Sequence, residues 1–263
     1  MRGAAGATAW DLASECVEET LAAGATPSLE RLGRLGQLGA LPALVGAVRT
    51  GVEPARVALE YTREREGLGF GPAEITGELL ALGRVLERRG EKAARARLDG
   101  CIVEHVARVT AQLAERARRD PLTGLLNHRA FHARVAAEIA RARRYRSRIA
   151  LVVFDLDRFK ETNDSDGHQE GDRLLRVFAS ALSRAARGSD AVGRIGGDEF
   201  AALLIEAKRR SAAVFVDRVQ VRLRGRVAFS AGVALFPDEG SAADQLLALA
   251  DSRLYEEKAE KAA

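Results

Sequence analysis

Two units of different fold class are predicted by this sequence: an N-terminal all-α helical bundle and a C-terminal α/β (α+β) domain with a central sheet flanked by helices. Up to about residue 118, segments of helical periodicity alternate with glycine and proline, and no segment reads convincingly as a strand. From residue 120 onward, apolar β-branched runs of strand length alternate with helical patterns. This alternation is typical of a sheet whose faces are covered by helices.

The N-terminal unit is expected to be a helical regulatory or sensory domain over residues 1–91. Its helical segments are separated by three stretches rich in glycine and proline, which are GATPS at 24–28, RTGVEP at 49–54 and GLGFGP at 67–72. Because glycine commonly follows a helix end, the helix that starts near Pro72 is expected to stop at Gly90. A plain bundle without a ligand is the simpler alternative. Haem is disfavoured, because His105 is the only histidine before residue 128.

Residues 92–119 are predicted to form one long helix that links the two units. Apolar residues recur along it at spacings of four, three and four, as in the seam of a coiled coil: Ile102, Val106, Val109 and Leu113. The seam covers less than two heptads, because Asp99 and Arg116 occupy its next positions. A helix that packs on its own bundle therefore remains an alternative to a dimer.

Residues 120–263 are expected to form the second domain. Three apolar runs have the length and composition of strands, at 148–156, 199–205 and 226–236. Helical patterns lie around them, at 128–145, 169–186, 208–223 and 242–258. The short segment DAVGRI is expected to pair with the strand 199–205 as a tight hairpin, because Gly196-Gly197 separates the two.

The composition excludes several classes of protein. With 47% hydrophobic and 30% charged residues, a chain of 263 residues can bury a core. Its formal charge of +4 does not distinguish between nucleic acid, anionic lipid and phosphate-bearing small molecules as partners. Cys16 and Cys101 are too few for a disulfide scaffold and are not spaced as a metal cluster. The N-terminus lacks the apolar core of a signal peptide, and the weakly apolar run 35–48 is too short to span a bilayer. We expect a cytoplasmic protein with no membrane insertion and no nucleic-acid partner.

Three acidic residues stand at the ends of predicted strands. Asp155 ends the strand 148–156, where a carboxylate is costly unless it is paired or binds a cation. Asp198 and Glu199 follow Gly196-Gly197 at the tip of the predicted hairpin. If the two strands are neighbours, Asp155 and Asp198 converge, and such hard oxygen ligands suit Mg²⁺ bound together with substrate phosphates. Turn or cap chemistry is the simpler alternative for each acid taken alone.

The polar stretch KETNDSDGHQEGD at 160–172 lies between these acids. It is not a calcium loop, because Thr162 and Arg173 stand where that loop requires ligating acids. Asparagine and aspartate side chains can instead satisfy the Watson–Crick edge of guanine, since a carboxylate accepts from the donors on that edge. Just before the stretch, Asp157 is expected to cap a helix that begins at Arg158.

Six ordered motifs in the second half are similar to those of the GGDEF family of diguanylate cyclases. The signature is Gly196-Gly197-Asp198-Glu199-Phe200. The other motifs are DPLTGLLNHRAF at 120–131, FDLDRFKETND at 154–164, GHQEGDRLL at 167–175, SAGVALFP at 230–237 and LADSRLYEEK at 249–258. The resemblance covers residues 120–258. It implies a palm-like fold and the Mg-dependent condensation of two GTP into cyclic di-GMP and pyrophosphate.

The resemblance also implies roles for single residues. Mg²⁺ (or Mn²⁺) would be held by the catalytic acids Asp155 and Asp198 and by the backbone carbonyl of Leu156. Glu199 is the family's second essential acid, at the metal or the 3′-hydroxyl. Further substrate-binding positions are Asn163 and Asp172 at guanine, Phe159, Lys160 and Lys258 at the phosphates, Arg194 near the nucleotide, and His168 as a structural motif residue.

An inhibitory product site is implied by Arg187-Gly188-Ser189-Asp190, which fits the family's RxxD motif at the usual distance before Gly196. Its arginine can grip phosphate or stack on guanine, while its aspartate accepts from the guanine edge. A solvated helix end is the alternative. One departure from the family is Ala262, which stands where an arginine is expected to bind phosphate, and Lys261 could supply a point charge there.

Control of activity is expected to come from dimerisation and from the N-terminal domain. Cyclic di-GMP has two-fold symmetry, so two catalytic domains must face each other, and a homodimer is expected. The segment 61–86 faintly resembles the helical domains of RsbR-type stressosome regulators. Two other functions remain open: a catalytically weak protein that acts as a cyclic di-GMP receptor, and a cyclase for a mixed dinucleotide. The intact acids disfavour the first, and Asp172 disfavours the second.

Overall fold

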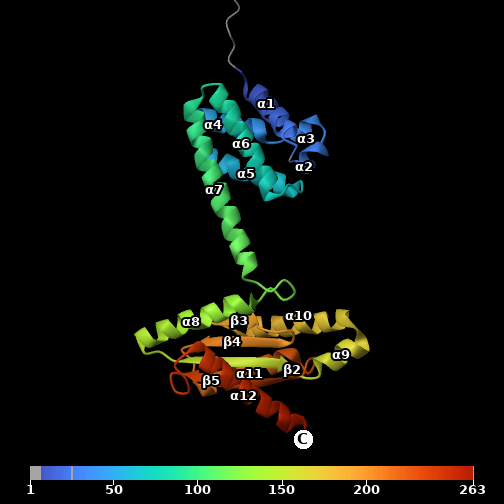
Figure 1. Ribbon diagram of the computed structural model, residues 1–263, viewed down its shortest axis with the longest axis vertical. Coiled ribbons are helices and arrows are strands. Elements are labelled where there is room, and N and C mark those ends of the chain that lie inside the picture. The colour runs from blue at the N-terminus through green and yellow to red at the C-terminus, as the bar shows by residue number, and fades with distance from the viewer. Residues whose placement is uncertain (1–6, 25, 263) are drawn as a thin grey trace, which may run out of the picture. The chain divides into compact units, whose positions relative to one another are not determined.

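The computed structural model describes residues 7–24 and 26–262, and the chain divides into two compact units, Met1–Ala114 and Glu115–Ala263 (Figure 1). The first six residues, which enter the signal-peptide expectation, lie outside the described residues. Over the described part of the chain, no helix is both long enough and apolar enough to cross a membrane.

The N-terminal unit is a helical bundle, as predicted. Its helices are α1 (Ala9–Ala22), α2 (Pro27–Glu30), α3 (Arg34–Leu38), α4 (Leu41–Thr50), α5 (Pro54–Gly67), α6 (Pro72–Arg88) and α7 (Lys92–Ala117), and α7 continues into the second unit. Helix α1 begins with a capping box, in which the Thr8 hydroxyl accepts from the Asp11 N–H and the Asp11 carboxylate accepts from the Thr8 N–H. Buried leucine and valine side chains of α1, α4 and α6 form the core of the bundle.

A buried ion pair joins α5 to α6 inside this bundle. The Arg65 and Glu78 side chains are each only 1% exposed, and the guanidinium donates to both carboxylate oxygens at 3.0 and 2.9 Å. The Tyr61 hydroxyl donates to the same carboxylate, and Arg65 also donates to the Gly36 carbonyl. Because every partner is hydrogen-bonded, the pair holds α3, α5 and α6 in one arrangement.

Helix α7 presents two neighbouring faces with different surroundings. One face is buried in the bundle through Ala94, Leu98, Cys101 and His105. The residues of the predicted seam lie beside this face, beginning with Ile102, which directly follows Cys101. Of the seam residues, only Ile102 packs against the bundle core. Val106 is 45% exposed and Leu113 is 54% exposed. Beyond Ile102, the seam therefore lies outside the face by which α7 packs on its own bundle.

The C-terminal unit is built on a five-stranded sheet in the order β1-β3-β4-β2-β5. Its strands are β1 (Leu126–Asn127), β2 (Ile149–Leu156), β3 (Ala191–Arg194), β4 (Glu199–Ile205) and β5 (Phe229–Phe236). Strand β2 lies between β4 and β5 and pairs with both in antiparallel register, whereas β1 pairs with β3 in parallel. All eight residues of β2 are buried, which explains its continuous apolar sequence.

Helices cover both faces of this sheet, which confirms the predicted fold class. They are α8 (His128–Tyr145), α9 (Phe159–Asp166), α10 (His168–Ala185), α11 (Arg209–Leu223) and α12 (Ala243–Ala262). Successive residues of β2 point to opposite faces: Phe154 packs with Phe178 of α10 and Phe215 of α11, whereas Val153 packs with residues of α8 and α12.

The helix expected from Arg158 is present as α9, but the expected cap is wrong. Arg158 itself occupies the N-cap position, with a φ of 57° and no side-chain cap. The Asp157 carboxylate accepts from the Ser230 hydroxyl at 2.8 Å, and its N–H donates to the Ala228 carbonyl. Asp157 therefore joins the end of β2 to β5, a contact that local sequence patterns do not reveal.

Candidate active site at the end of the central strand

Asp155 lies near the end of β2, between acidic and polar neighbours on the two adjacent strands. In the antiparallel register it stands opposite Glu199 of β4 on one side and Ser230 of β5 on the other. Only 8% of Asp155 is exposed. The sheet thus brings Asp155 and Glu199 together, and β2 and β4 are neighbours, the condition on which the sequence predicted that Asp155 and Asp198 converge.

The hairpin between β3 and β4 carries Asp198 to the same edge. The Ile195 and Gly196 N–H groups both donate to the Glu199 carbonyl, at 2.9 and 3.3 Å, and close the turn. The Leu156 N–H donates to the Asp198 carbonyl at 3.3 Å. A Cβ at Gly196 would lie 2.2 Å from a Glu199 carboxylate oxygen. A side chain at this position would therefore displace the Glu199 carboxylate from where the hairpin holds it.

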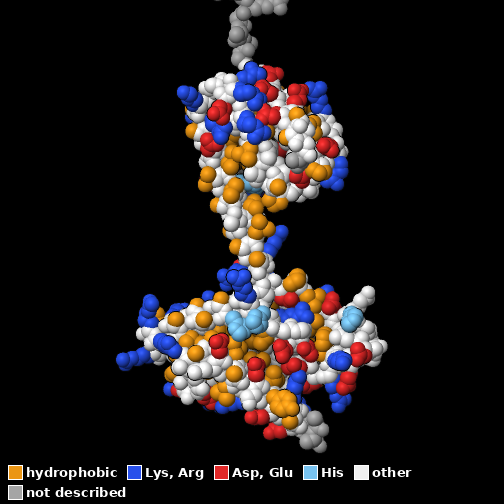
Figure 2. Space-filling model, viewed as in Figure 1, with side chains coloured by type: hydrophobic (Ala, Val, Ile, Leu, Met, Phe, Trp, Pro, Cys, Tyr) orange, Lys and Arg blue, Asp and Glu red, His pale blue; other side chains and the backbone are white. Residues whose placement is uncertain are grey.

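Burial and like charges disfavour the ionised form of these acids. Acidic side chains gather on the face of the C-terminal unit shown in Figure 2. Burial raises the pKa of Asp155, and the charge of Asp198 adds to the rise while Lys258 opposes it. Partial desolvation of its carboxyl also raises the pKa of Glu199, an exposed residue, with further contributions from Asp155 and Asp251. Asp251 lies on α12, and the sequence did not reveal it as a neighbour of this site.

Lys258 is the positive charge nearest to Asp155. Its ammonium nitrogen lies 2.5 Å from Asp155 Oδ1, although no described residue donates to that oxygen with good hydrogen-bond geometry. Lys258 reaches the site because α12 packs tightly on β5. A Cβ at Gly232 would lie 1.9 Å from the Ala250 carbonyl oxygen, so only glycine permits this approach.

The acids at this edge fit a divalent cation. Asp155 is buried near the charges of Asp198 and Asp157, and Lys258 is its described ion-pair partner, so a divalent cation would offset the remaining repulsion between these acids. The described residues contain no cluster of three or more potential metal ligands. Mg²⁺ does not need one, because it keeps several waters and binds through one or two carboxylates together with phosphates. The ligand role of the Leu156 carbonyl stays a prediction.

The residues expected at guanine lie on α9 and at the start of α10. A Cβ at Gly171 would lie 2.0 Å from the Asn163 side-chain oxygen and 3.2 Å from the Phe159 ring. Gly171 therefore lets α9 pack on α10 and brings Asn163 beside the turn that carries Asp172. The Asp172 carboxylate pairs with Arg176 at 3.4 Å. Lys160 and His168 are both exposed.

Arg194 holds the hairpin in place. Its guanidinium donates to the Gly197 carbonyl at 2.6 Å and also contacts the Asp120 carboxylate at 3.3 Å. Asp120 in turn accepts from the Thr123 N–H and hydroxyl. The sequence suggested that Arg194 reaches the nucleotide, but here it joins the first turn of the domain to the hairpin tip.

Arg187 and Asp190 form a turn between α10 and β3. The Asp190 carboxylate accepts from the Arg187 N–H at 2.9 Å and from the Ile205 N–H at 3.1 Å. The Asp190 N–H donates back to the Arg187 carbonyl. The Arg187 side chain is exposed. Asp190 thus has a structural role that the motif alone does not show.

Lys261 is engaged near the end of α12. Its ammonium donates to the Phe229 carbonyl at 2.6 Å and to the Ser230 hydroxyl at 3.0 Å, and it lies 2.8 Å from the Glu257 carboxylate. These contacts tie α12 to β5. A point charge at the phosphates, which the sequence suggested for Lys261, would require them to break.

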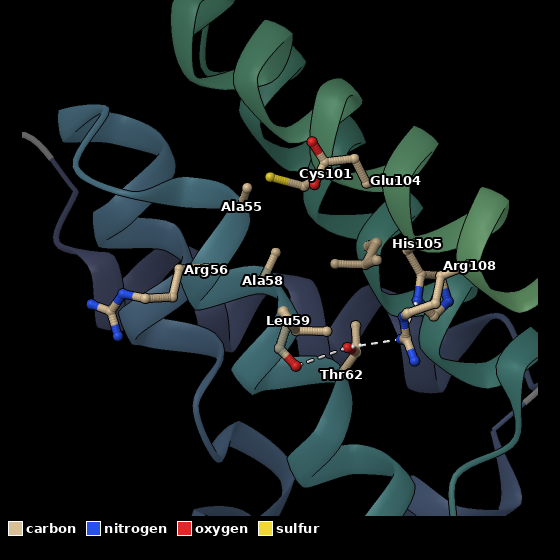
Figure 3. A pocket seen from close by; sticks show the side chains of 10 residues that line it. Ala55, Arg56, Ala58, Leu59, Thr62, Cys101, Glu104, His105 and Arg108 are labelled. Atoms are coloured by element: carbon tan, nitrogen blue, oxygen red, sulfur yellow. Dashed lines mark hydrogen bonds between the residues drawn. The ribbon is translucent and has the colours of Figure 1, made fainter.

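A separate cavity of about 420 Å³ lies within the N-terminal unit (Figure 3). It is lined by Ala55, Arg56, Ala58, Leu59 and Thr62 of α5, Leu79 of α6, and Cys101, Glu104, His105 and Arg108 of α7. Arg108 donates to the Thr62 hydroxyl, which donates to the Leu59 carbonyl. The cavity is therefore bordered by α7, the helix that continues into the second unit.

Comparison with known proteins connects the C-terminal unit to one family. The family described as "Diguanylate cyclase, GGDEF domain" matches residues 117–263. Diguanylate cyclase TpbB of Pseudomonas aeruginosa is 35% identical over 156 residues, which cover 55% of this chain and 36% of TpbB. Seven other curated relatives, among them further diguanylate cyclases and a cyclic di-GMP phosphodiesterase, are covered over 14% to 50% of their length. The chain spans half or less of each of these relatives.

Two solved structures extend the similarity beyond the catalytic motifs. The coiled coil and GGDEF domain of DgcB from Caulobacter crescentus, in complex with cyclic di-GMP, has a TM-score of 0.60 at 28% identity, over 64% of this chain and 94% of that chain. Diguanylate cyclase SiaD of P. aeruginosa, in complex with its activator SiaC, has a TM-score of 0.55 at 28% identity, over 84% of this chain and 88% of that chain. Because the second unit is only Glu115–Ala263, the similarity to SiaD extends into the N-terminal helices.

Proposed function

The chain belongs to the GGDEF domain family of diguanylate cyclases, and from this premise we propose that it condenses two GTP into cyclic di-GMP and releases two pyrophosphates. The observation that carries the proposal is the position of Asp155. It is buried at the end of β2, opposite Glu199 and near the charge of Asp198, and its described cationic partner is the Lys258 ammonium at Oδ1. A buried carboxylate in this state is suited to a cation.

The catalytic acids divide the work between metal binding and proton transfer. Asp155 and Asp198, with the Leu156 carbonyl, would hold Mg²⁺ or Mn²⁺, which neutralises phosphate charge and lowers the pKa of the attacking 3′-hydroxyl. Glu199 is suited to accept a proton from that hydroxyl, because burial raises its pKa toward the working range of a general base. Lys258 neutralises Asp155, and a cation in its place would leave the ammonium for a phosphate oxygen.

The residues that would bind the nucleotide lie on α9 and at the start of α10. Asn163 and Asp172 would read the guanine edge, since their side chains together offer a donor and several acceptors. Asp172 would exchange its ion pair with Arg176 for the guanine donors. Phe159 and Lys160 begin α9, where N–H groups at a helix start favour phosphate. We assign His168 to this substrate-binding segment, and Arg194 to holding the hairpin tip.

Two chains must cooperate, because each active site supplies one half of a symmetric product. We propose a homodimer through the exposed seam of α7, with regulation from the N-terminal unit. SiaD, whose similarity to this chain reaches the N-terminal helices, was solved with an activator protein. A regulator that binds the N-terminal unit would change how two α7 helices pair. The pairing of these helices would determine whether the two active sites face each other at reacting distance.

Product inhibition is proposed at Arg187 and Asp190. The exposed Arg187 guanidinium is free to meet the phosphate or base of cyclic di-GMP. Asp190 uses its two carboxylate oxygens for backbone N–H groups, and each oxygen retains a lone pair for a guanine donor.

The decisive experiment is incubation of the pure protein with GTP and Mg²⁺, followed by identification of the nucleotides by mass spectrometry. Cyclic di-GMP and pyrophosphate are expected as products. A parallel reaction with ATP and GTP together tests for a mixed dinucleotide. Tight binding of cyclic di-GMP without turnover would instead support the receptor function, which the Lys258–Asp155 ion pair favours if the pair persists in the presence of Mg²⁺.

A further inference from the structure

Six arginines line one groove on the C-terminal unit. The groove has a volume of about 750 Å³ and lies between α10 and the end of α11. Its lining residues are Arg173, Arg176, Val177, Ser180, Ala181 and Arg184 on one side, and Val221, Arg222, Arg224 and Arg226 on the other. Neither residue of the RxxD motif lines it. Apart from the ion pair between Arg176 and Asp172, nothing in the proposed cyclase reaction uses this groove.

Most of this positive charge is not neutralised by the protein. Arg173 pairs with Glu170 and Arg176 pairs with Asp172, the only carboxylate partners of the groove among the described residues. Arg184, Arg222, Arg224 and Arg226 have no described carboxylate within 4 Å. The Arg222 guanidinium donates to the Arg184 backbone carbonyl at 3.2 Å, which places the Arg222 side chain beside the end of α10. Like charges held in one groove repel each other, so negative charge from a ligand would stabilise it.

The arrangement of the arginines fits a small ligand that carries several negative charges along its length. Arg173, Arg176 and Arg184 follow one side of α10 over a length of about 16 Å. Guanidinium groups match phosphate oxygens through two parallel hydrogen bonds, which makes arginine the preferred residue for phosphate recognition. The apolar residues of the lining are Val177, Ala181 and Val221, and Val221 is 72% exposed.

The lining also argues against single-stranded nucleic acid. Proteins that bind single strands stack bases on aromatic side chains, and none of the lining residues is aromatic. We propose that this groove binds a multiply phosphorylated small ligand, either a nucleoside polyphosphate or an inorganic polyphosphate. The shared chemistry is a run of phosphate groups held by the four unpaired arginines. The site does not depend on cyclase activity.

Calorimetric titration of the full-length chain tests this proposal directly. The probes are inorganic tripolyphosphate and adenosine 5′-tetraphosphate, in about 0.1 M salt without divalent cations, so that metal-dependent binding at the catalytic acids is suppressed. The Arg184→Gln/Arg226→Gln variant removes two unpaired charges and keeps a polar side chain at each position. Its matched control is Arg144→Gln/Arg210→Gln, which removes two exposed arginines outside the groove.

The wild-type chain is expected to bind at least one probe, with an affinity that falls as salt rises. The groove variant should bind at least about tenfold more weakly, whereas the control should match the wild type. Equal binding of both probes identifies phosphate alone as the determinant, and preference for the nucleotide identifies a base contact as well. The proposal is overturned if neither probe binds, if the control variant loses as much affinity as the groove variant, or if Arg187→Ala alone abolishes binding. Tighter binding of a single-stranded oligonucleotide that displaces both probes would also overturn it.

Discussion

Asp155 and Glu199 stand directly opposite each other on adjacent antiparallel strands, and burial raises the pKa of both carboxyls. The charge of Asp155 adds to the rise at Glu199. A raised pKa means that the folded state binds these protons more tightly than the unfolded chain, whose carboxyls titrate near pH 4. The contribution of these two acids to the free energy of unfolding of the metal-free protein should therefore fall as pH rises from about 4 through the raised values.

A divalent cation should reverse this trend, because it binds only the ionised carboxylates. We predict that Mg²⁺ or Mn²⁺ raises the melting temperature little near pH 4 and increasingly toward pH 7. At a metal concentration of about 100 times Kd, the gain near pH 7 should approach about 2.7 kcal/mol. Differential scanning calorimetry across this pH range measures the effect. Asp155→Asn should lose it, and an equal gain at both pH values in the wild type would contradict metal binding by these acids.

Removal of either hairpin acid should abolish turnover and leave the fold intact. Asp198→Asn and Glu199→Gln should each lower kcat by at least about 10²-fold, because metal binding or proton transfer is lost. Neither side chain lies in the hydrophobic core, so the free energy of unfolding should change by less than about 0.5 kcal/mol. Asp217→Asn, an exposed acid on α11, is the matched control. Pyrophosphate release and chemical denaturation measure the two effects, and wild-type turnover in either variant would remove its residue from the mechanism.

Base selectivity should depend on Asp172. Asp172→Ala removes acceptors from the guanine edge, and the loss should reduce discrimination between GTP and ATP by about 1–3 kcal/mol. Arg176→Ala provides an informative contrast, because it frees the Asp172 carboxylate from its ion pair and should leave discrimination intact. Competition between the two nucleotides gives the ratio of kcat/KM values. Unchanged selectivity in Asp172→Ala would show that another residue reads the base.

Product inhibition should be relieved by Arg187→Ala without loss of initial rate. The Arg187 side chain is exposed, and the turn is held by its backbone N–H, which alanine retains. Asp190→Ala is a poorer probe, because it leaves the Arg187 and Ile205 N–H groups without their acceptor at a cost of about 1–3 kcal/mol. Calorimetry with cyclic di-GMP and progress curves test the prediction, with Arg210→Ala as the control. Equal affinity in wild type and Arg187→Ala would exclude this turn as the product site.

The sequence was informative where function and fold depend on local pattern. The buried strand ending at Asp155 and the Gly-Gly hairpin before Asp198 could be predicted, because periodicity and turn chemistry are properties of short segments. The parts of the structure that depend on close packing between segments distant in sequence could not be predicted. Gly232 permits the contact of α12 with β5, and Gly171 makes room for Asn163, but neither glycine lies in a sequence pattern that predicts such a contact.

Long-range polar contacts were missed for the same reason. Arg194 contacts Asp120 across 74 residues of sequence, and Asp251 influences Glu199 from another element. The buried pair of Arg65 and Glu78 is unexpected as well, because charged residues are rarely fully buried and helical periodicity alone would place them at the surface.

Dimerisation through α7 is the last prediction, and exposure of the seam is what favours it. Val106 and Leu113 are about half exposed, whereas the bundle is packed through a neighbouring face of the same helix. Val106→Glu/Val109→Glu would place charges in the seam between two copies, where an unpaired charge costs several kcal/mol. The dimer should weaken accordingly. Turnover at low protein concentration should fall with it and partly recover at high concentration, as mass action requires.

The control for this experiment is Ala107→Glu/Thr110→Glu, which adds the same two charges at the same spacing on exposed positions one residue away. Light scattering alongside turnover at several protein concentrations separates the two variants. Because a seam of less than two heptads is too short to hold a dimer alone, contacts of the N-terminal bundle should contribute, and the seam variant should retain a measurable dimer at high concentration. If Val106→Glu/Val109→Glu stays dimeric and fully active at every concentration, the two catalytic domains must meet through another surface, and regulation must reach them without the pairing of α7.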